Sequence, residues 1–181
     1  MDINLIKSEF PIFSNKIKGK PLVYLDSSNS SQKPKSVLDC LDHFYKNEFS
    51  NIGRSIHSLA VNATNKFDET RNSVKNFINA NNKDEIIFTK NATESINLVA
   101  STFGQKNIKK GDEIIITELE HHSNYVPWHY LRETKGAIIK FAPINDEGDI
   151  IISKLKELIT SKTKIIAVTH LSNVTGTIVP I

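Results

Sequence analysis

Short apolar runs alternate with longer amphipathic runs between residues 85 and 169, and this alternation is what most constrains the fold. The predicted strands are 85–89, 113–117, 137–141 and 164–169, and the predicted helices between them are 93–103, 126–134 and 152–159. Strands separated by helices of this length are typical of βαβ units on a parallel sheet. The near-continuous Ile and Val in the strands agree, because parallel strands are buried on both faces. The sequence therefore predicts an α/β fold, a mostly parallel sheet with flanking helices.

The residues before this region predict fewer strands. After a short opening helix we expect a strand at 22–25, a helix at 36–48, an irregular segment at 50–57 and a helix at 60–79. The last helix has a plausible inward-facing stripe formed by Phe67, Arg71, Val74, Phe77 and Ile78. No repeat or flexible linker interrupts the chain. We therefore predict an amino-terminal segment, residues 1–20, and a partial large domain, residues 21–181.

Composition excludes several classes of protein. The chain has 181 residues, 24% of them charged, and its formal charge of +3 is too small to indicate a nucleic-acid surface. No apolar run approaches the length of a membrane helix, and the amino terminus does not resemble a secretory signal, so a cytoplasmic protein is expected. Cys40 is the only cysteine, which excludes an internal disulfide. We expect Cys40 to be a buried thiol on a helix.

Polar clusters follow three of the predicted strands, and the carboxyl ends of parallel strands share one edge of a sheet, where ligands bind. In the first cluster, 89–95, the amides at the start of the next helix and the Thr93 hydroxyl are suited to a phosphate. A simpler interpretation is an Asn91 N-cap with Glu94 reaching back. The cluster lacks the glycines and lysine of a P-loop, which argues against a nucleoside triphosphatase.

The second cluster contains His121 and His122. Adjacent histidines near carboxylates suggest a metal hydrolase, but the zincin spacing is absent, so we predict no metal site. A neutral imidazole can instead lie over an aromatic ligand ring and move a proton. A histidine here could also have a purely structural role as the cap of the next helix, and this role fits His122 better than His121.

The third cluster, 170–177, contains Asn173, whose amide offers an acceptor and two donors but is also typical of a turn. Apart from these clusters, Arg54 lies in the irregular segment 51–57 and has the geometry to bind a carboxylate bidentately. Phosphate donors, a stacking imidazole, an amide and a carboxylate clamp together suit a phosphorylated aromatic cofactor with an amino-acid substrate.

The motifs that carry these groups closely resemble the amino-terminal portion of SufS-type cysteine desulfurases, in the class V aminotransferase group of pyridoxal-phosphate enzymes of fold type I. The matching segments are 24–27, 44–45, 51–57, 92–94, 96–100, 120–128 and 169–177. The resemblance implies an incomplete large domain of the aspartate aminotransferase type. It also implies a homodimeric transferase that converts L-cysteine to alanine and passes the sulfur, as a persulfide, to an acceptor protein for iron–sulfur cluster assembly.

By this resemblance, Thr93 and the amide of Ala92 bind the pyridoxal 5'-phosphate phosphate group, and His121 is the catalytic imidazole that stacks on the ring. Asn173 lies near the ring hydroxyl and the substrate carboxylate, and Arg54 lies at the substrate side of the site. The Schiff-base lysine, the ring-nitrogen aspartate and the persulfide cysteine of the family are expected beyond Ile181. The chain by itself is therefore expected to be inactive.

This chain departs from the family pattern at several positions. Gly53 replaces a histidine, Ser55 replaces a glycine, and Asn91-Ala92 replaces Gly-Thr before the phosphate-binding threonine. The run after residue 176 leads toward a further helix that the chain does not contain, so we expect a fragment or an edge that something else covers. Three alternatives stay open: half of a split enzyme, a non-catalytic remnant that binds a full-length desulfurase, and part of a selenocysteine lyase or another class V relative.

Overall fold

The computed structural model describes residues 2–181. They form two compact units, which divide in the sequence between Ile87 and Phe88. The predicted division at residue 20 stays a prediction. No helix within the described residues is both long enough and apolar enough to cross a membrane.

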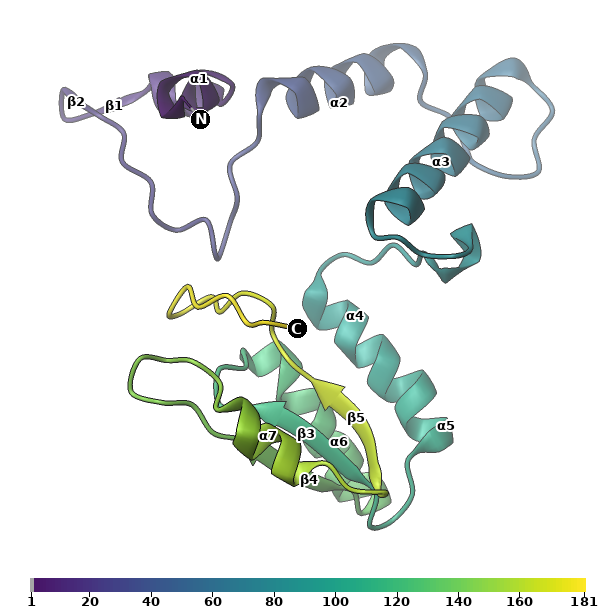
Figure 1. Cartoon of the computed structure of the whole chain (residues 1–181). Coiled ribbons are helices and arrows are strands. Elements are labelled where there is room, and N and C mark those ends of the chain that lie inside the picture. The colour runs from purple at the N-terminus through teal and green to yellow at the C-terminus, as the bar shows by residue number, and fades with distance from the viewer. Residues whose placement is uncertain (1) are drawn as a thin grey trace. The chain divides into compact units, whose positions relative to one another are not determined.

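The first unit is mainly helical (Figure 1). Its elements are α1 (Ile3–Ser8), η1 (Pro11–Ser14), β1 (Lys16–Ile17), β2 (Lys20–Pro21), α2 (Lys35–Asn47), α3 (Ser58–Phe77) and η2 (Lys83–Glu85). The predicted opening helix, the two long helices and the irregular segment between them are confirmed. The two short strands pair as an antiparallel hairpin whose turn places Gly19 at φ 78°, a conformation that glycine adopts without strain.

Two predicted strands do not form. The predicted strands at 22–25 and 85–89 have no ladder partner within residues 2–181; Glu85 instead ends η2, and Val23 and Leu25 are exposed. The carbonyl of Ile86 instead accepts a hydrogen bond from the Arg71 guanidinium. A strand needs a neighbour to bond with, so β propensity alone was insufficient at both places.

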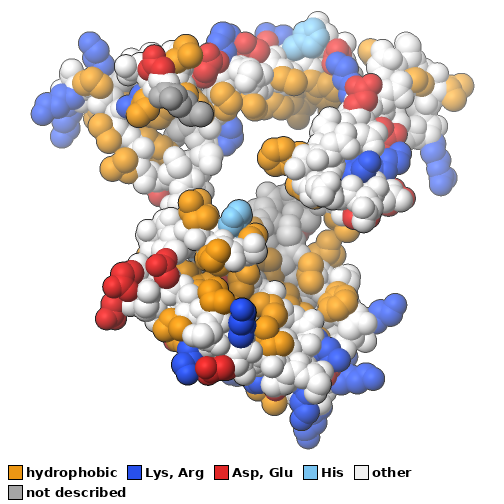
Figure 2. Space-filling view, in the orientation of Figure 1, with side chains coloured by type: hydrophobic (Ala, Val, Ile, Leu, Met, Phe, Trp, Pro, Cys, Tyr) orange, Lys and Arg blue, Asp and Glu red, His pale blue; other side chains and the backbone are white. Residues whose placement is uncertain are grey.

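Few side chains of the first unit are buried. Ala60 and Ala63 form the buried part of α3, Phe67 and Arg71 are half-buried, and Phe77 is 90% exposed, so the predicted inward stripe fails at its carboxyl end. Figure 2 shows apolar side chains gathered along one side of α2. Within the described residues this side of α2 therefore carries apolar surface that is left in contact with solvent. Cys40 on α2 is exposed as well, so the expectation of a buried thiol was wrong.

The second unit contains the predicted parallel sheet. Its elements are α4 (Ala92–Val99), the π-helix η3 (Ala100–Gly104), α5 (Gln105–Asn107), β3 (Glu113–Thr117), η4 (His122–Asn124), α6 (Val126–Lys135), β4 (Ile138–Ala142), α7 (Ile152–Leu158) and β5 (Thr163–Ala167). The strand order is β4-β3-β5, with both neighbours parallel to β3. The three strands and their helices are confirmed, and α6 and α7 lie on opposite faces of the sheet (Figure 1).

The central strand explains why this unit folds. Ile114, Ile115 and Ile116 are fully buried, because successive side chains of a strand point to opposite faces and helices cover both. Ile114 and Ile116 pack with Trp128 and Leu131 of α6 in one cluster. A smaller cluster joins residues 119, 150 and 179 near the carboxyl ends of the strands. These clusters fix the edge of the sheet at which the polar segments emerge.

β5 lies at one margin of the three-stranded sheet. The chain after it turns back, and Leu171 and Ile178 form an antiparallel bridge. We call residues 170–179 the terminal hairpin. It is continuous with the carboxyl end of β5, where the third polar cluster was predicted.

Candidate functional site

The start of α4 is capped as the simpler interpretation predicts. The Asn91 side chain accepts a hydrogen bond from the Glu94 amide at 2.9 Å, and the Glu94 carboxylate accepts one from the Lys90 amide at 2.6 Å. Among residues 2–181 no partner is recorded for the amides of Ala92 and Thr93 or for the Thr93 hydroxyl. The capping pair thus satisfies other donors and leaves three donors at this helix end for a ligand.

His121 follows β3 and caps η4. Its Nδ1 accepts a hydrogen bond from the Ser123 amide at 3.2 Å and lies 3.0 Å from the Ser123 hydroxyl. A neutral ring whose Nδ1 is an acceptor carries its proton on Nε2. The cap therefore fixes the direction of the imidazole and leaves Nε2 and the exposed ring faces for a ligand.

The capping role was predicted for the wrong histidine. His121, not His122, accepts the bond that begins η4. The reason is local: an N-cap precedes the first helical residue, and η4 begins at His122 rather than later. The two rings are tilted by 53° with centroids 6.0 Å apart. No cluster of three metal-ligating side chains occurs in the described part of the chain.

Glu120 joins the ends of two strands. Its Oε1 accepts hydrogen bonds from the Thr117 hydroxyl at 2.6 Å and from the Thr169 amide at 2.9 Å. Its Oε2 accepts one from Asn124 Nδ2 at 2.6 Å, and Asn124 Oδ1 accepts one from Trp128 Nε1 at 3.1 Å. The predicted meeting of the second and third polar clusters at one edge is therefore confirmed, and Glu120 is the residue that connects them.

Glu120, Asn124 and Trp128 were not assigned roles from the sequence. A signal was present, because the three residues are spaced by four and could face one another around helical turns. Their connection to Thr169 could not be read from the sequence, since it depends on the pairing of β3 with β5.

Asn173 lies in the turn of the terminal hairpin. The turn is held by the Ser172 hydroxyl, which accepts hydrogen bonds from the amides of Val174 and Thr175 at 3.3 and 3.2 Å. The Asn173 side chain is exposed, and no partner for it is recorded among residues 2–181. Its amide is available to a ligand, and its predicted role stays a prediction.

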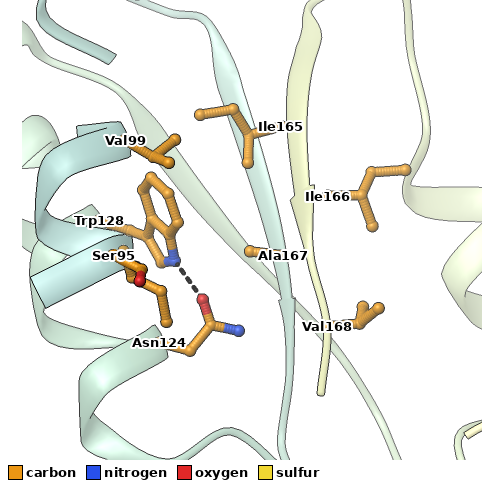
Figure 3. A pocket seen from close by; sticks show the side chains of 9 residues that line it. Ser95, Val99, Asn124, Trp128, Ile165, Ile166, Ala167 and Val168 are labelled. Carbon is orange, nitrogen blue, oxygen red and sulfur yellow. Dashed lines mark hydrogen bonds between the residues drawn. The ribbon is translucent and has the colours of Figure 1, made fainter. Parts of the chain in front are cut away.

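A groove of about 400 Å³ runs beside this network, between α4, α6 and β5. Its lining residues are Ser95, Ile96, Val99, Asn124, Trp128, Ile165, Ile166, Ala167 and Val168. Figure 3 shows the Trp128 indole with its Nε1 turned toward Asn124. The groove is mostly apolar and has polar groups at the end nearest Asn124, as is common for small-molecule sites.

Arg54 belongs to the first unit, in the irregular segment before α3. It is exposed, and the structure records no partner for its guanidinium within residues 2–181. The neighbouring Gly53 has φ 115°, which a histidine at this position would adopt only with strain. His57 caps α3 by accepting a hydrogen bond from the Ala60 amide at 3.3 Å. The predicted substrate contact of Arg54 stays a prediction.

Comparison with known proteins identifies the family. The class-V aminotransferase family matches residues 23–181, and this chain belongs to that family. Among its relatives are probable cysteine desulfurases from Staphylococcus aureus, 47% identical over 175 residues, and Mycolicibacterium paratuberculosis, 46% identical over 180 residues. The resemblance to cysteine desulfurases predicted from the motifs is confirmed.

Solved structures give the same result. The apo cysteine desulfurase of Thermococcus onnurineus NA1 superposes with a TM-score of 0.89 at 34% identity and covers 99% of this chain. The cysteine desulfurase CsdA of Escherichia coli gives 0.80 at 32% identity, also covering 99% of this chain. The predicted fold class is therefore confirmed.

The chain matches only part of each relative. It spans 42% of the staphylococcal protein and 26% of the mycobacterial one, and 43% of the Thermococcus chain. The activity of the full-length relatives can therefore only be proposed for this chain.

Proposed function

We propose that this chain is the amino-terminal part of a pyridoxal-phosphate-dependent cysteine desulfurase and provides one side of its cofactor site. The observation that carries the proposal is that the second unit contains three groups suited to this cofactor: a helix start whose first amides have no recorded partner within residues 2–181, an imidazole held in one orientation, and an exposed amide. The cysteine desulfurase relatives, at 46–47% identity, support the choice of reaction.

The side chains of the second unit fit the proposed cofactor. Its phosphate is an anion, and the amides of Ala92 and Thr93 with the Thr93 hydroxyl, none of which has a recorded partner within residues 2–181, are the donors that an anion needs. Its flat ring suits the exposed face of His121, which the Ser123 amide holds in one orientation. Asn173 would approach the ring hydroxyl or the substrate carboxylate. When bound, the cofactor would supply an electron sink for the amino acid's Cα.

The proposed roles of this chain's residues follow from these positions. The start of α4 binds the phosphate and fixes the ring's location. His121 covers one ring face, and its Nε2 is the atom that holds or moves a proton. Arg54 and Asn173 are proposed to bind the carboxylate of L-cysteine. We propose that the lysine that anchors the cofactor and the cysteine that accepts the sulfur lie outside this chain, so it is inactive alone.

The wider features of the family are proposed for the whole enzyme. They are a homodimeric state, a cytoplasmic location, and transfer of the persulfide sulfur to an acceptor protein for iron–sulfur cluster assembly. Exposed apolar side chains on α2, such as Leu41 and Tyr45, support association with further protein surface.

Binding of pyridoxine 5'-phosphate to the 181-residue chain tests the proposed site. This probe keeps the ring and the phosphate but lacks the aldehyde, so it does not react with surface lysines. We expect titration to shift the amide signals of Ala92 and Thr93 in nuclear magnetic resonance spectra, together with the His121 ring signals. The matched control for Thr93→Val is Thr102→Val, which removes a hydroxyl whose one recorded hydrogen bond within residues 2–181 is donated to the Leu98 carbonyl.

Thr93→Val is expected to weaken binding roughly tenfold or more, because a hydrogen bond to a charged group contributes about 1.5–3 kcal/mol. Thr102→Val should leave the affinity unchanged. Signals that move only elsewhere, or equal losses in both variants, would contradict the proposal. Alanine formation from L-cysteine by the purified chain would overturn its expected inactivity.

A further inference from the structure

The Glu120 side chain is held by hydrogen bonds from three different segments of the second unit. The carboxylate accepts three hydrogen bonds, from Thr117 at the end of β3, from Thr169 after β5, and from Asn124 in η4. A carboxylate has about four acceptor positions, so Glu120 is nearly saturated by protein donors. It does not serve as a free acid or base in this arrangement. We call Glu120 and its three hydrogen-bond donors, Thr117, Asn124 and Thr169, the Glu120 junction.

Two of the three contacts lead to residues of the proposed site, and the third, from Thr117, holds Glu120 to the end of β3. Asn124 closes η4, and its backbone amide donates to the His121 carbonyl at 2.8 Å, so holding Asn124 holds the turn that His121 caps. Thr169 is the residue immediately before the terminal hairpin, which carries Asn173. One carboxylate thus connects the histidine segment with the asparagine segment, although they are separated by about 50 residues of chain.

The junction continues to the groove. Asn124 uses its amide nitrogen toward Glu120 and its oxygen toward the Trp128 indole, so its orientation is fixed by both partners. Trp128 is 3% exposed and belongs to the main core of the unit. The chain of hydrogen bonds from Thr169 through Glu120 and Asn124 to Trp128 therefore anchors the edge of the site to the core.

We propose that Glu120 is a positioning residue that sets the placement of His121 relative to the terminal hairpin and Asn173. It acts through Asn124 and Thr169 and does not itself touch the cofactor. This inference rests on the proposed function for its biological meaning, but the positioning itself is measurable without any ligand.

The donor and acceptor pattern makes a sharp test possible. In Glu120→Gln the new amide oxygen can still accept from Thr117 and Thr169, but the new NH₂ faces Asn124 Nδ2, another donor. Turning the Asn124 amide over relieves that conflict and places its NH₂ against the Trp128 N–H instead. In either arrangement one buried donor loses its acceptor.

A second substitution restores the pattern. In the double variant Glu120→Gln, Asn124→Asp, the introduced glutamine amide donates to one oxygen of the introduced aspartate, whose other oxygen accepts from Trp128. The formal charge of the pair is unchanged. Glu133→Gln is the matched control, because Glu133 is an exposed glutamate of α6 whose one recorded ion pair within residues 2–181 is with the adjacent Arg132.

Trp128 is the only tryptophan of the chain, so its indole N–H gives a single signal in nuclear magnetic resonance spectra. We expect Glu120→Gln to shift this signal and the His121 ring signals, and the double variant to return both toward their original positions. We also expect the dissociation constant for pyridoxine 5'-phosphate to rise about tenfold, equivalent to about 1.4 kcal/mol, in the single variant. In the double variant it should return to within a factor of about two.

Circular dichroism identifies conditions in which every variant is folded, so that loss of stability is not mistaken for loss of positioning. A folded Glu120→Gln protein with unchanged His121 signals, or a double variant that restores nothing, would overturn the inference. If the original chain does not bind the probe, the proposed function fails. The indole and His121 signals then still decide whether Glu120 positions this segment.

Discussion

Replacing Gly104 with alanine sets two effects of opposite sign against each other. Gly104 is the last residue of η3 and is buried with helical dihedral angles, φ −59° and ψ −53°. An ideal Cβ at this position would lie 2.6 Å from Leu131 Cδ1 and 3.3 Å from Cδ2. Leu131 is fully buried in the main core, so rotating its side chain only exchanges one methyl contact for the other.

The sizes of the two effects predict that steric crowding against Leu131 outweighs the gain in helix propensity. Alanine gains about 1 kcal/mol over glycine from helix propensity. Adding atoms to a well-packed core costs typically about 1–3 kcal/mol. Because both Leu131 methyls are closer than an ordinary contact, we expect the upper part of that range and a net loss of about 1–2 kcal/mol in the free energy of unfolding. The same substitution in a Leu131→Ala background should instead be stabilising, since the crowding is absent.

Urea unfolding followed by Trp128 fluorescence measures this effect. Trp128 lies in the same core cluster as Leu131, and as the only tryptophan it reports on the second unit. The four proteins of the double-mutant cycle give the coupling directly. Stabilisation by Gly104→Ala in both backgrounds would refute the predicted close approach of η3 to α6.

Three further predictions use the same unfolding assay. Burial lowers the pKa of His129, whose Nε2 has no hydrogen-bond partner within residues 2–181. The second unit should therefore lose stability as the pH falls below about 6.5, where the unfolded chain binds the proton more readily. The variant His129→Phe should flatten this pH dependence. The hydrogen bond from Lys140 lowers the pKa of the Glu113 carboxyl. The stabilising contribution of this carboxylate is therefore present above pH 4.5 and is lost as the pH falls further. A Glu113→Gln protein with the same loss of stability in acid would contradict this. Asn91→Ala should cost about 1 kcal/mol by removing the cap of α4, whereas Asn91→Ser should largely keep it.

The parts of the fold that could be predicted from the sequence are those with strong local signals. β3 was predicted at its observed residues, because three consecutive isoleucines between polar residues leave little choice of period. The strands predicted at 22–25 and 85–89 do not form, since a strand also requires a partner and no local pattern supplies one. The exposed Phe77 and Cys40 show the same limit: an amphipathic pattern gives the apolar side of a helix but not what covers it.

The site shows a similar division. The Asn91 cap and the availability of Thr93 follow from residue type at a helix start, and both were predicted. The meeting of the second and third clusters followed from parallel strand order. The role of Glu120 could not be predicted, because it depends on a hydrogen bond to an amide 49 residues away. The roles of Arg54 and Asn173 stay predictions, since their side chains are exposed and make no recorded contact within residues 2–181.

A chimeric enzyme tests most directly whether this chain provides one side of a desulfurase site. In this chimera the chain replaces the region that it matches in the staphylococcal relative, 42% of that protein. Alanine formation from L-cysteine is measured with the original chain and with His121→Gln. We expect the chimera to be active and the variant to be slower by roughly 100-fold or more, the usual effect of a positioned proton-transfer group. A folded chimera that contains pyridoxal 5'-phosphate yet forms no alanine, or a His121→Gln variant with the full rate, would contradict the proposed role of this chain.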